Sequence, residues 1–510
     1  MVISDILDVV PGSRLVRGAP SASVLGVARD SRRVAKGDVF VAVPGHREDG
    51  ARYVEEALAR GAAAVVSEKE LDLPPDVPLV LVKDARSALA GIAAIAHGHP
   101  SRSLWVTGIT GTNGKTTTSY LLRSIYRNAG LRAGLVGTVE FDSGRGTVPS
   151  TATTPDPVEL QRLLRSMVEN GARGAILEVS SHALVQRRVE GVEFRVGVFT
   201  NLTREHLDYH GDLASYEAAK EILFRGLDPS AVAVLNAGDP VSLRFARSTR
   251  ARVVTYGIGD GALGAAGTTN ATVRGRVVSE SLSGTTFVLA ADGAESKISI
   301  SLPGRHNVEN ALAAAAAALA VGIDRRAVIA GLEAFDRVPG RLDPVDLGQG
   351  FKVFVDYAHT DDALRKVLAA LRPLVPGRIL VVFGCGGDRD RGKRPRMGRA
   401  VEELADLFWV TNDNPRGEDP SSIAEMILSG LESRKRARVV LDRERAIAEA
   451  IGEAREGDAV LVAGKGHECG QIFRERTLPF DDREVAAAAV RSAMSRATRR
   501  PGLAHREMSA

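Results

Sequence analysis

The sequence predicts an α/β protein made of three domains. Its 510 residues correspond to about three domains at roughly 150 residues each. Strand signals alternate with helix signals along the middle of the chain, which is the order expected of a parallel sheet wrapped by helices. The composition, 44% hydrophobic and 25% charged, is that of an ordinary globular protein and gives no sign of disorder across the body of the chain.

The first domain is expected over residues 1–101. Apolar runs predict strands at 39–43, 63–66 and 79–82. A helix is expected at 53–59, between the first two of these strands. This pattern indicates a small α/β unit.

The second domain is expected over residues 102–338. It opens with a strand at 104–107, which runs into a glycine-rich loop and then a helix at 116–129. The segment at about 255–303 alternates Thr, Val, Ser and Gly, and we interpret it as inserted β-hairpins. The alanine-dominated run that follows predicts a buried helix. Further strands are expected at 174–179, 196–199 and 231–236.

The third domain is expected over residues 339–495, and residues 496–510 are expected to form a flexible tail. Most of its predicted strands are followed by a polar or glycine-rich turn, and ligands of such sheets gather at the carboxyl ends of strands. The strands are predicted at 353–355, 379–383, 407–410 and 459–462.

Charge, cysteine content and hydropathy exclude several classes of protein. The last sixteen residues hold four arginines and one glutamate, so most of the net charge of +4 lies in the tail, and we expect no nucleic-acid partner. Cys385 and Cys469 cannot form a disulfide framework, which favours a reducing compartment. There is no apolar run of about 20 residues and no signal peptide. We therefore expect a cytoplasmic monomer without a membrane partner.

The loop after strand 104–107 has the chemistry of a phosphate site. Backbone N–H groups of a glycine-rich turn can surround phosphate oxygens, and the following helix N-terminus adds a positive end. Lys115 can reach the β- and γ-phosphates, and the Thr116 hydroxyl can hold Mg²⁺. The spacing is a variant, because Ile109 stands where the common motif has its first glycine. The predicted ATP-binding residues here are Gly111, Thr112, Asn113, Gly114, Lys115, Thr116 and Thr117.

Two more predicted strands of the second domain end in polar residues. Glu178 lies at the end of strand 174–179, where a carboxylate beside a phosphate loop can bind Mg²⁺ or its water. His206 lies in the polar segment that follows strand 196–199. A lone histidine is more often structural, but this setting favours a site for His206. Both interpretations stay open for His182, Asp208 and His210.

In the third domain, three loops follow three strands. They contain Arg389, the sequence Asp-Asn-Pro-Arg at 413–416, and Glu468. Arg389 and Arg416 offer bidentate forks for a carboxylate, and Glu468 can accept hydrogen bonds from an ammonium group. The alternative, three ordinary loops, does not explain why the charged groups coincide at three strand ends.

These residues resemble the Mur ligase family, which also includes folylpolyglutamate synthase. The resemblance begins with the loop at 111–117 and continues along nearly the whole chain. It implies a central P-loop parallel-sheet ATPase domain, flanked by an N-terminal α/β UDP-binding domain and a C-terminal Rossmann-like domain. It also implies ATP-dependent formation of an amide bond. The sequence at 413–416 resembles the recognition motif of diaminopimelate-adding members.

The resemblance therefore implies two substrates, UDP-N-acetylmuramoyl-L-alanyl-D-glutamate and meso-diaminopimelate, joined during synthesis of a peptidoglycan precursor. ATP would phosphorylate the terminal carboxylate of the nucleotide substrate, and the incoming amine would displace phosphate from the acyl phosphate. Lys115 and two Mg²⁺ ions would neutralise charge on the moving phosphoryl group. We expect closure of the third domain over the central one to exclude water.

The resemblance also assigns residues to this chemistry. Lys220 matches a lysine that the family carbamylates, although sequence alone indicates an ordinary solvated helix lysine. The implied metal ligands are Thr116, Glu178, His206 and Lys220 as its carbamate, and the catalytic set is Lys115, Glu178, His206 and Lys220. Further ATP contacts are implied for Asn307, Arg341, Asp356 and His359.

Substrate contacts are implied at both ends of the reaction. Without the resemblance, the first-domain residues would be interpreted as surface turns. The implied UDP-substrate residues are Ser31, His46, Arg47, Glu48, Thr153, Thr154, Ser180, Gln186 and Arg188. The implied diaminopimelate residues are Arg389, Asp413, Asn414, Pro415, Arg416, Gly464 and Glu468.

Three alternatives compete with this hypothesis. A lysine-adding or folate-extending ligase is disfavoured by the first domain and by the sequence at 413–416. A P-loop motor or switch gives no reason for Arg389, Arg416 and Glu468 to recur at three strand ends. A non-catalytic precursor-binding protein is disfavoured by intact Lys115, Thr116 and Glu178.

Overall fold

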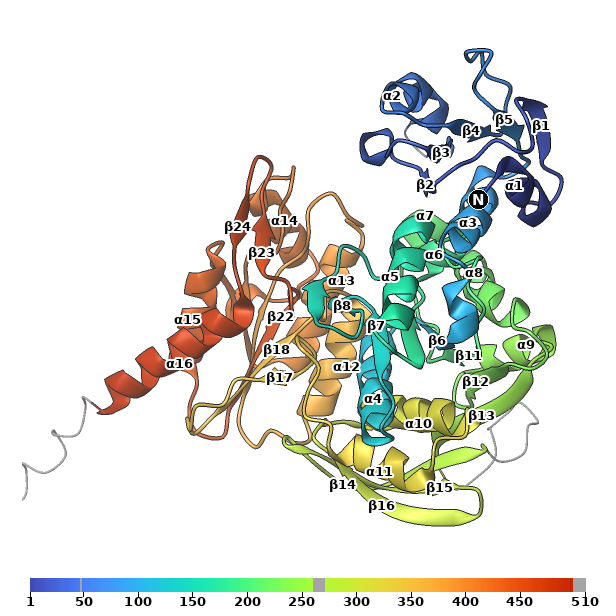
Figure 1. Ribbon diagram of the computed structural model, residues 1–510. Helices are drawn as coiled ribbons and strands as arrows, with labels where there is room; N and C mark the ends of the chain where they lie inside the picture. Colours follow the sequence, from blue (N-terminus) through green and yellow to red (C-terminus); the bar gives the residue numbers. More distant parts are fainter. Residues whose placement is uncertain (46–47, 260–270, 499–510) are drawn as a thin grey trace, which may run out of the picture.

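The computed structural model describes residues 1–45, 48–259 and 271–498. Three sheets of five, eleven and six strands follow one another along this part of the chain, and a separate two-stranded hairpin lies near the C-terminus. Helices pack against each sheet, so the predicted α/β class is confirmed. Figure 1 shows the third domain beside the central one, while the first domain projects above it.

The first sheet has the strand order β1-β5-β4-β3-β2. All its pairs are parallel except β1 with β5. Its core strands are buried on both faces because helices cover the sheet, which explains their unbroken apolar sequences. The elements are β1 (Arg14–Arg17), β2 (Gly26–Ala28), β3 (Asp38–Val41), β4 (Ala64–Ser67), β5 (Leu79–Leu81), α1 (Ile3–Val9), α2 (Val54–Ala59) and α3 (Ala85–Ala96).

The central sheet has the order β16-β15-β14-β13-β12-β11-β6-β10-β7-β8-β9. Its middle is parallel, and antiparallel hairpins extend both edges. The strands are β6 (Trp105–Thr110), β7 (Ala133–Val136), β8 (Glu140–Asp142), β9 (Thr147–Pro149), β10 (Gly174–Glu178), β11 (Val196–Phe199), β12 (Val232–Asn236), β13 (Arg252–Ile258), β14 (Val273–Ser281), β15 (Gly284–Ala291) and β16 (Ala294–Ile300).

The helices of the central domain cover both faces of its sheet. They are α4 (Lys115–Asn128), α5 (Pro157–Glu169), α6 (Ser181–Val185), α7 (Leu207–His210), α8 (Leu213–Arg225), α9 (Val241–Ser248), α10 (Arg305–Ala320) and α11 (Arg325–Glu333). The predicted inserted hairpins are confirmed by β14, β15 and β16; part of the predicted segment, residues 260–270, lies outside the described residues. The predicted alanine-rich helix is α10, and its alanines are buried against the sheet.

The first strand of this domain is longer than the sequence predicted. β6 continues through Gly108 and Ile109 to Thr110, because β10 pairs with it on one side and β11 on the other. Gly108 leaves room for the ring of Phe194, since a Cβ there would lie 2.6 Å from that ring. The phosphate loop therefore begins only at Gly111, and Ile109 is a buried strand residue rather than part of the loop.

The third sheet has the order β17-β18-β22-β19-β20-β21. Its parallel strands β18, β22, β19 and β20 are neighbours, so their carboxyl ends share one edge. The strands are β17 (Asp343–Pro344), β18 (Lys352–Asp356), β19 (Ile379–Phe383), β20 (Leu407–Val410), β21 (Ala437–Val439) and β22 (Ala459–Ala463), with the hairpin β23 (Gly470–Ile472) and β24 (Thr477–Pro479).

Helices also pack on both faces of the third sheet. They are α12 (Asp361–Leu371), α13 (Lys393–Leu404), α14 (Pro420–Leu428), α15 (Arg443–Glu453) and α16 (Asp482–Thr498). The expected tail boundary at 495 is wrong in one respect, because α16 continues to Thr498. The rest of the predicted tail lies outside the described residues.

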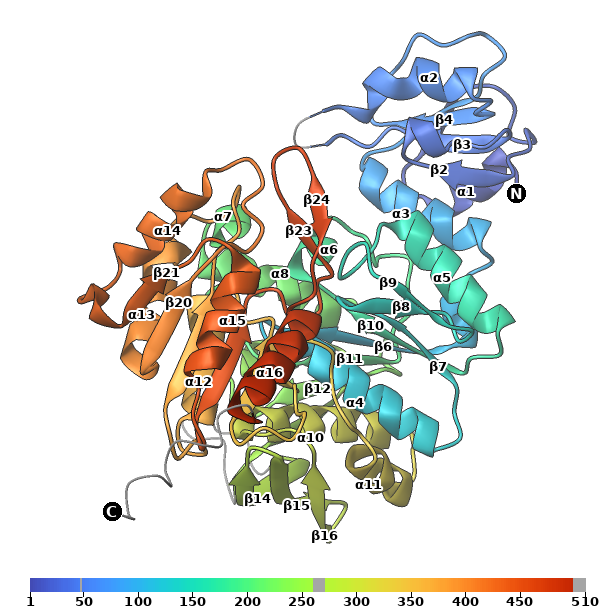
Figure 2. The ribbon, with the colours of Figure 1, turned by 90° about the vertical axis from the view of Figure 1, so that its left-hand side faces the viewer.

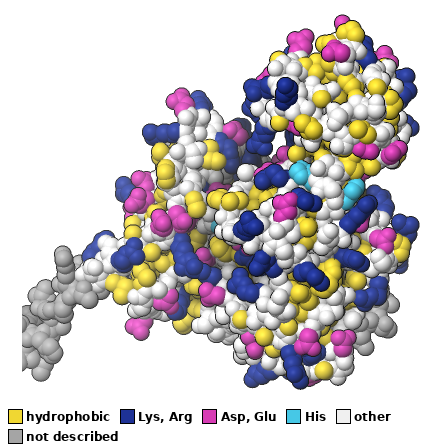
Figure 3. All heavy atoms as spheres, in the orientation of Figure 1, with side chains coloured by type: hydrophobic (Ala, Val, Ile, Leu, Met, Phe, Trp, Pro, Cys, Tyr) yellow, Lys and Arg dark blue, Asp and Glu magenta, His cyan; other side chains and the backbone are white. Residues whose placement is uncertain are grey.

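The outer surface carries mixed charge. Figure 3 shows Lys and Arg interspersed with Asp and Glu over the face that it presents. In the turned view of Figure 2, the hairpin of β23 and β24 stands between the third domain and the first. No α-helix in the described ranges combines the length and apolar character that crossing a bilayer requires.

Candidate active site

The phosphate loop runs from Gly111 to the first turn of α4 and fits tightly against the end of β11. Gly111 has φ +149°, and a Cβ there would lie 1.8 Å from Thr200 Oγ1. The Asn201 side-chain oxygen accepts from Asn113 N–H at 3.0 Å, and Thr200 Oγ1 donates to the Asn113 carbonyl at 2.6 Å. The loop is therefore held in shape by its neighbour strand.

Lys115 is placed to neutralise phosphate charge. Its Nζ donates to the carbonyls of Gly111 and Thr112 at 2.8 and 2.9 Å, so the ammonium lies over its own loop. Burial lowers the pKa of Lys115, while nearby Glu205 and Glu178 oppose that shift. This is the position that a lysine binding β- and γ-phosphates would occupy.

Glu178 is the centre of a buried hydrogen-bond network. Its side chain, at the end of β10, is fully buried. It accepts from Thr116 Oγ1 at 3.0 Å, from Thr138 N–H at 3.1 Å and from Thr138 Oγ1 at 2.8 Å. Sequence analysis missed Thr138, although it follows the end of β7 closely, the same kind of position that revealed Glu178.

Lys220 is buried, so the expectation of a solvated lysine is wrong. Its side chain on α8 is 1% exposed, and Nζ lies 4.3 Å from the ring centroid of Tyr216. Within the described ranges it forms no ion pair. Burial, together with the positive charge of Lys115, lowers its pKa well below the usual value. The free amine, which is the form that reacts with CO₂, is thereby favoured.

His206 belongs to a group of rings beside Lys220. It adopts φ +55°, and its ring meets that of His182 edge-on at 4.9 Å. Although 42% of the side chain is exposed, partial burial and the charge of Lys115 lower the pKa of His206 to about 4. A neutral imidazole can ligate a metal ion. His210, in contrast, is engaged with Ser181 Oγ at 2.9 Å.

The predicted metal ligands lie in one crevice. Only two of them, Glu178 and His206, have side chains of the types that commonly bind metal ions. Among the described residues, no group of three or more His, Cys, Asp or Glu side chains could hold a metal ion. Glu178 and His206 would therefore need the Thr116 hydroxyl, a carbamate on Lys220 and nucleotide phosphates to complete a magnesium site. The hydrogen bond between Thr116 and Glu178 fits this set, because it brings two of the proposed ligands together.

A cavity of about 330 Å³ lies between the phosphate loop and the third domain. Arg341 spans it: its guanidinium carbon lies 4.6 Å from the ring centroid of Tyr357, and Nη2 lies 3.4 Å from Thr116 Oγ1. Asp356 accepts from the N–H groups of Leu342 and Ala358 at 2.6 and 2.8 Å, which fixes both adjoining loops. The predicted residues that line this cavity are Thr112, Asn113, Gly114, Lys115, Thr116, Thr117, Thr153, Ser180, His206, Asn307, Arg341, Asp356 and His359.

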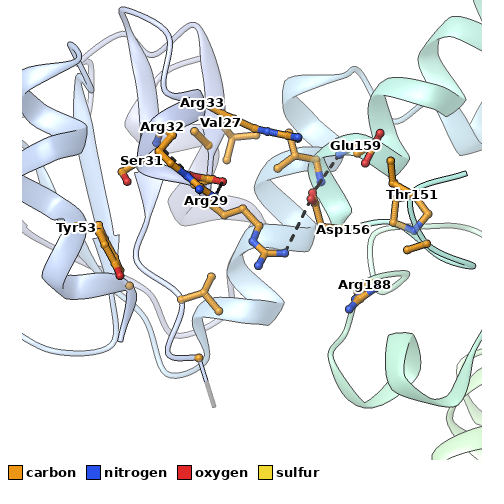
Figure 4. A pocket seen from close by; sticks show the side chains of 18 of the residues that line it. Val27, Arg29, Ser31, Arg32, Arg33, Tyr53, Thr151, Asp156, Glu159 and Arg188 are labelled. Atoms are coloured by element: carbon orange, nitrogen blue, oxygen red, sulfur yellow. Dashed lines mark hydrogen bonds and ion pairs between the residues drawn. The ribbon is translucent and has the colours of Figure 1, made fainter. Parts of the chain in front are cut away.

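A second cavity of about 880 Å³ lies between the first and central domains. Of the predicted residues, Ser31, Glu48 and Arg188 line it, whereas His46 and Arg47 lie outside the described residues. Ser31 Oγ donates to Glu56 at 2.8 Å, and Glu48 accepts from the Tyr53 hydroxyl. Figure 4 shows Arg29, Ser31, Arg32, Arg33 and Tyr53 on one side and Thr151, Asp156, Glu159 and Arg188 on the other.

The central-domain side of this cavity is preorganised by hydrogen bonds. Arg188 donates to the Gln186 side-chain oxygen at 2.7 and 3.1 Å and to the Thr154 carbonyl at 2.7 Å. Thr154 Oγ1 in turn donates to the Glu178 carbonyl at 2.7 Å and accepts from Ser180 N–H. This chain of contacts connects the larger cavity to the centre at Glu178.

The three predicted loops of the third domain meet at one edge of its sheet. Asn414 donates to Glu468 Oε2 at 2.8 Å. Lys465, fully buried, donates to the Asn414 side-chain oxygen at 3.0 Å and to Glu468 at 3.2 Å. Sequence analysis missed this role of Lys465. Gly464 lies tightly beside Asp413, because a Cβ there would be 2.7 Å from its carboxylate.

The two arginines differ in burial. Arg416 is half-buried and donates to the Gly387 carbonyl at 3.0 Å, while Arg389 is exposed and contacts the Asp388 carbonyl. Burial, followed by the nearby charge of Arg389, lowers the pKa of Arg416. The guanidinium groups thus lie close enough to repel one another, and an anion between them would relieve that repulsion.

Comparison with known proteins identifies the family. Family models match residues 23–97 (Mur ligase family, catalytic domain), 109–318 (Mur ligase middle domain) and 340–466 (Mur ligase, glutamate ligase domain). The Geobacillus kaustophilus UDP-N-acetylmuramoyl-L-alanyl-D-glutamate–2,6-diaminopimelate ligase is 43% identical over 498 residues, which cover 96% of this chain and 99% of the relative. The chain belongs to the Mur ligase family.

Solved Mur ligase structures share its architecture. A structure of UDP-N-acetylmuramoyl-L-alanyl-D-glutamate–2,6-diaminopimelate ligase is 32% identical with a TM-score of 0.67, covering 97% of this chain and 99% of that one. The Mycobacterium tuberculosis folylpolyglutamate synthase, complexed with ADP and AMPPCP, is 20% identical with a TM-score of 0.59, covering 79% and 94%. The latter likeness concerns the fold alone. The predicted family and fold are confirmed.

Further residues of this Mur ligase line the sites without having been predicted. Arg29 and Arg162 line the larger cavity, and Arg29 lies 3.9 Å from Asp156 across the domain boundary. Glu309 and Lys366 line the smaller cavity. Arg162, Glu309 and Lys366 lie within helices, and Arg29 follows β2, a strand that sequence analysis did not predict, so only the folded chain brings them to the sites.

Proposed function

We propose that this Mur ligase uses ATP to join meso-diaminopimelate to the D-glutamate of UDP-N-acetylmuramoyl-L-alanyl-D-glutamate. The observation that carries the proposal is the cluster of Arg389, Arg416 and Glu468, whose loops meet at the carboxyl edge of the third sheet. The relatives described above support it, because they are named for this reaction and match almost the whole chain.

ATP is proposed to bind in the cavity between the phosphate loop and the third domain. The backbone of Gly111–Gly114 and the ammonium of Lys115 suit its phosphates. Asn307, Arg341, Asp356 and His359 line the same cavity and would contact the rest of the nucleotide. A folylpolyglutamate synthase that shares this fold is solved with ADP and AMPPCP, which supports the use of a nucleotide.

The reaction needs the D-glutamate carboxylate to be made reactive. A carboxylate oxygen attacks the γ-phosphorus, the bond to the β-γ bridging oxygen breaks, and ADP leaves. The neutral amine then attacks the acyl carbon, inorganic phosphate leaves, and the amine loses a proton. Lys115 neutralises charge on the transferred phosphoryl group. Mg²⁺, held by Thr116, Glu178, His206 and carbamylated Lys220, would supply further positive charge to the phosphates.

The UDP precursor is proposed to lie in the larger cavity and extend toward Glu178. Ser31, Glu48 and Arg188 line that cavity, and Thr153 and Ser180 line the neighbouring one, so both cavities contribute to a single extended site. Thr154 and Gln186 hold Arg188 rather than reaching into the cavity. His46 and Arg47 remain proposed contacts.

Diaminopimelate is proposed to bind at the edge of the third sheet. Its distal carboxylate would lie against Arg416 and Arg389, and its distal ammonium would lie against Glu468. Asn414 and Lys465 hold Glu468 in place. Asp413, Pro415 and Gly464 shape the surrounding backbone. We further propose domain boundaries at 1–101, 102–338 and 339–495, which separate the three sheets.

One assay tests the proposal: phosphate release and amide formation from ATP and the UDP-muramoyl dipeptide, with meso-diaminopimelate and L-lysine offered separately. We expect kcat/KM to be at least about a hundredfold higher with diaminopimelate, because lysine leaves the arginines without a carboxylate. Equal use of lysine would refute the amino-acid assignment. Phosphate release that needs no amine would refute the ligase itself.

A further inference from the structure

An acidic side chain of the third domain is bonded directly to the phosphate loop. Asp362 lies in the first turn of α12, and its Oδ2 accepts from Asn113 Nδ2 and from Thr203 Oγ1, each at 3.0 Å. Lys366, one turn later on the same helix, pairs with that oxygen at 2.8 Å. A single carboxylate oxygen thus joins two segments of the central domain to the third.

The two central-domain segments have different tasks. Asn113 lies within the phosphate loop, whereas Thr203 lies in the segment between β11 and α7 that carries His206. They are already connected by a hydrogen bond from Thr203 N–H to Thr112 Oγ1 at 2.9 Å. The carboxylate of Asp362 therefore touches a unit that includes both the phosphate loop and a proposed metal ligand.

Asp362 is not needed to start its own helix. Thr360 is the N-cap of α12, and its Oγ1 accepts from Ala363 N–H at 3.2 Å. Asp361, the preceding acidic residue, pairs with Arg396 at 3.5 Å inside the third domain. The side chains of Asp361 and Asp362 are 29% and 30% exposed. Two acidic neighbours thus have similar exposure, but only Asp362 contacts the central domain.

We propose that Asp362 is a positioning residue that fastens the third domain to the ordered phosphate loop. This inference rests on the proposed function, because it concerns the moment at which the amine meets the acyl phosphate. The third domain carries the amine, and the phosphate loop carries the phosphoryl donor. The contact of Asp362 therefore couples the docking of the third domain to the ordered conformation of the phosphate loop.

The chemical consequence is protection of the intermediate. An acyl phosphate is hydrolysed when water reaches it before the amine does. If the third domain docks poorly, the acyl phosphate still forms, but water hydrolyses it before the amine can attack. Loss of the Asp362 contacts should therefore raise phosphate release per amide formed.

The experiment compares three variants of the full chain with the wild-type protein. Asp362→Ala removes the acceptor. Asp362→Asn keeps an oxygen acceptor, and Asp361→Ala removes the matched neighbour. Phosphate and amide are measured together with ATP, the UDP-muramoyl dipeptide and meso-diaminopimelate, and thermal unfolding checks that each variant is folded.

For Asp362→Ala we expect ligation kcat to fall about tenfold, since two hydrogen bonds to a charged acceptor are lost. Phosphate per amide should rise clearly above the wild-type ratio. The KM for ATP should stay within about threefold. The ion pair that Asp362 forms with Lys366 is partly exposed, so its loss should change the ATP cavity little. Asp362→Asn should largely restore the ratio, and Asp361→Ala should match the wild-type protein.

Two results would overturn the inference. One is a wild-type ratio and kcat in a folded Asp362→Ala protein, and the other is equal uncoupling in Asp361→Ala. Failure of the wild-type chain to ligate diaminopimelate would instead refute the proposed function, so the two failures are distinguishable.

Discussion

Two buried lysines of this Mur ligase have opposite surroundings. Lys465 lies against the carboxylate of Glu468 and the amide oxygen of Asn414. Lys220 lies over the Tyr216 ring and forms no ion pair within the described ranges, and burial lowers its pKa. A buried ammonium without a partner tends to lose its proton. The first side chain suits a structural role, and the second suits a reaction with CO₂.

The carbamate can be tested by replacing Lys220 with arginine, which stays charged and cannot be carbamylated. We expect Lys220→Arg to lose at least about a hundredfold in ligation kcat, because the proposed anion near the phosphates is gone. Carbon NMR of protein equilibrated with ¹³C-bicarbonate should give a carbamate signal in the wild-type chain that the variant lacks. A fully active arginine variant would rule out the carbamate.

Recognition of the distal carboxylate can be tested at Arg416. Because Arg416 is half-buried, we take the lower end of the cost of truncating a charged pair, about 2 kcal/mol. Arg416→Ala should accordingly raise the KM for diaminopimelate about 30-fold and leave the KM for ATP unchanged. Arg399→Ala, which removes an exposed arginine paired on α13, is the matched control. An unchanged diaminopimelate KM would contradict the assignment.

Sequence patterns identified the side chains that are proposed to carry chemistry, but they missed several side chains that hold these in place. Glu178 was found because it ends a predicted strand, and Arg416 and Glu468 because each lies in a segment that follows one. Lys465 was missed because no local pattern distinguishes a buried lysine from a solvated one. Arg29 and Arg162 were missed because the cavity that both line forms only where the first two domains meet.

At the scale of elements, one buried ion pair joins the last helix to two site loops. Arg443, in the first turn of α15, forms a bidentate pair with Asp482 of α16 at 2.6 and 2.7 Å, and both side chains are fully buried. The same guanidinium donates to the carbonyls of Asn412 and Ala463. These carbonyls immediately precede Asp413 and Gly464, so α16 stabilises the two loops that are proposed to bind diaminopimelate.

Arg443→Met should destabilise the protein by about 3–5 kcal/mol, since Asp482 would be left buried and uncompensated. Urea unfolding measures this loss. Arg445→Met is the matched control, because its pair with Glu449 on the same helix is exposed and its loss should not move the unfolding midpoint. A second replacement, Asp482→Leu, should recover most of the lost stability. Equal midpoints for Arg443→Met and Arg445→Met would contradict the argument.

The existence of most strands was predictable from the sequence, whereas the residues at which some elements end were not. β19 and β20 have the predicted bounds, since buried parallel strands are short unbroken apolar runs. The end of β6 was predicted three residues too early, because its glycine and threonine residues resemble a loop, whereas pairing on both sides makes them strand. The polar tail was predicted to begin at 496, whereas α16 continues to Thr498.

At the scale of the whole molecule, several partly buried imidazoles make stability depend on pH. Burial lowers the pKa of His182, His206, His306, His359 and His467 to about 4 in each case. Between that value and 6.5 the unfolded chain binds protons that the folded chain does not. Folding stability must therefore fall as pH falls through this window. Glu309, Asp343 and Asp356, whose pKa values burial raises, oppose the trend but are fewer.

We expect the unfolding temperature to decline steadily from pH 6.5 to pH 4. Unfolding at pH 5 should take up protons from the buffer, which calorimetry in buffers of different ionisation enthalpy measures. Proton release at pH 5, or a constant unfolding temperature down to that pH, would contradict the burial of these rings.

The two loops that frame the amino-acid site touch through their backbones. Gly387 N–H donates to the Asn414 carbonyl at 2.9 Å, and a Cβ on Gly387 would lie 1.8 Å from the Pro415 oxygen. The frame thus depends on main-chain contact, whereas Arg389, Arg416 and Glu468 extend from it as replaceable side chains. Substitution of these side chains is therefore expected to change which amine is accepted without disturbing the backbone contact between the two loops.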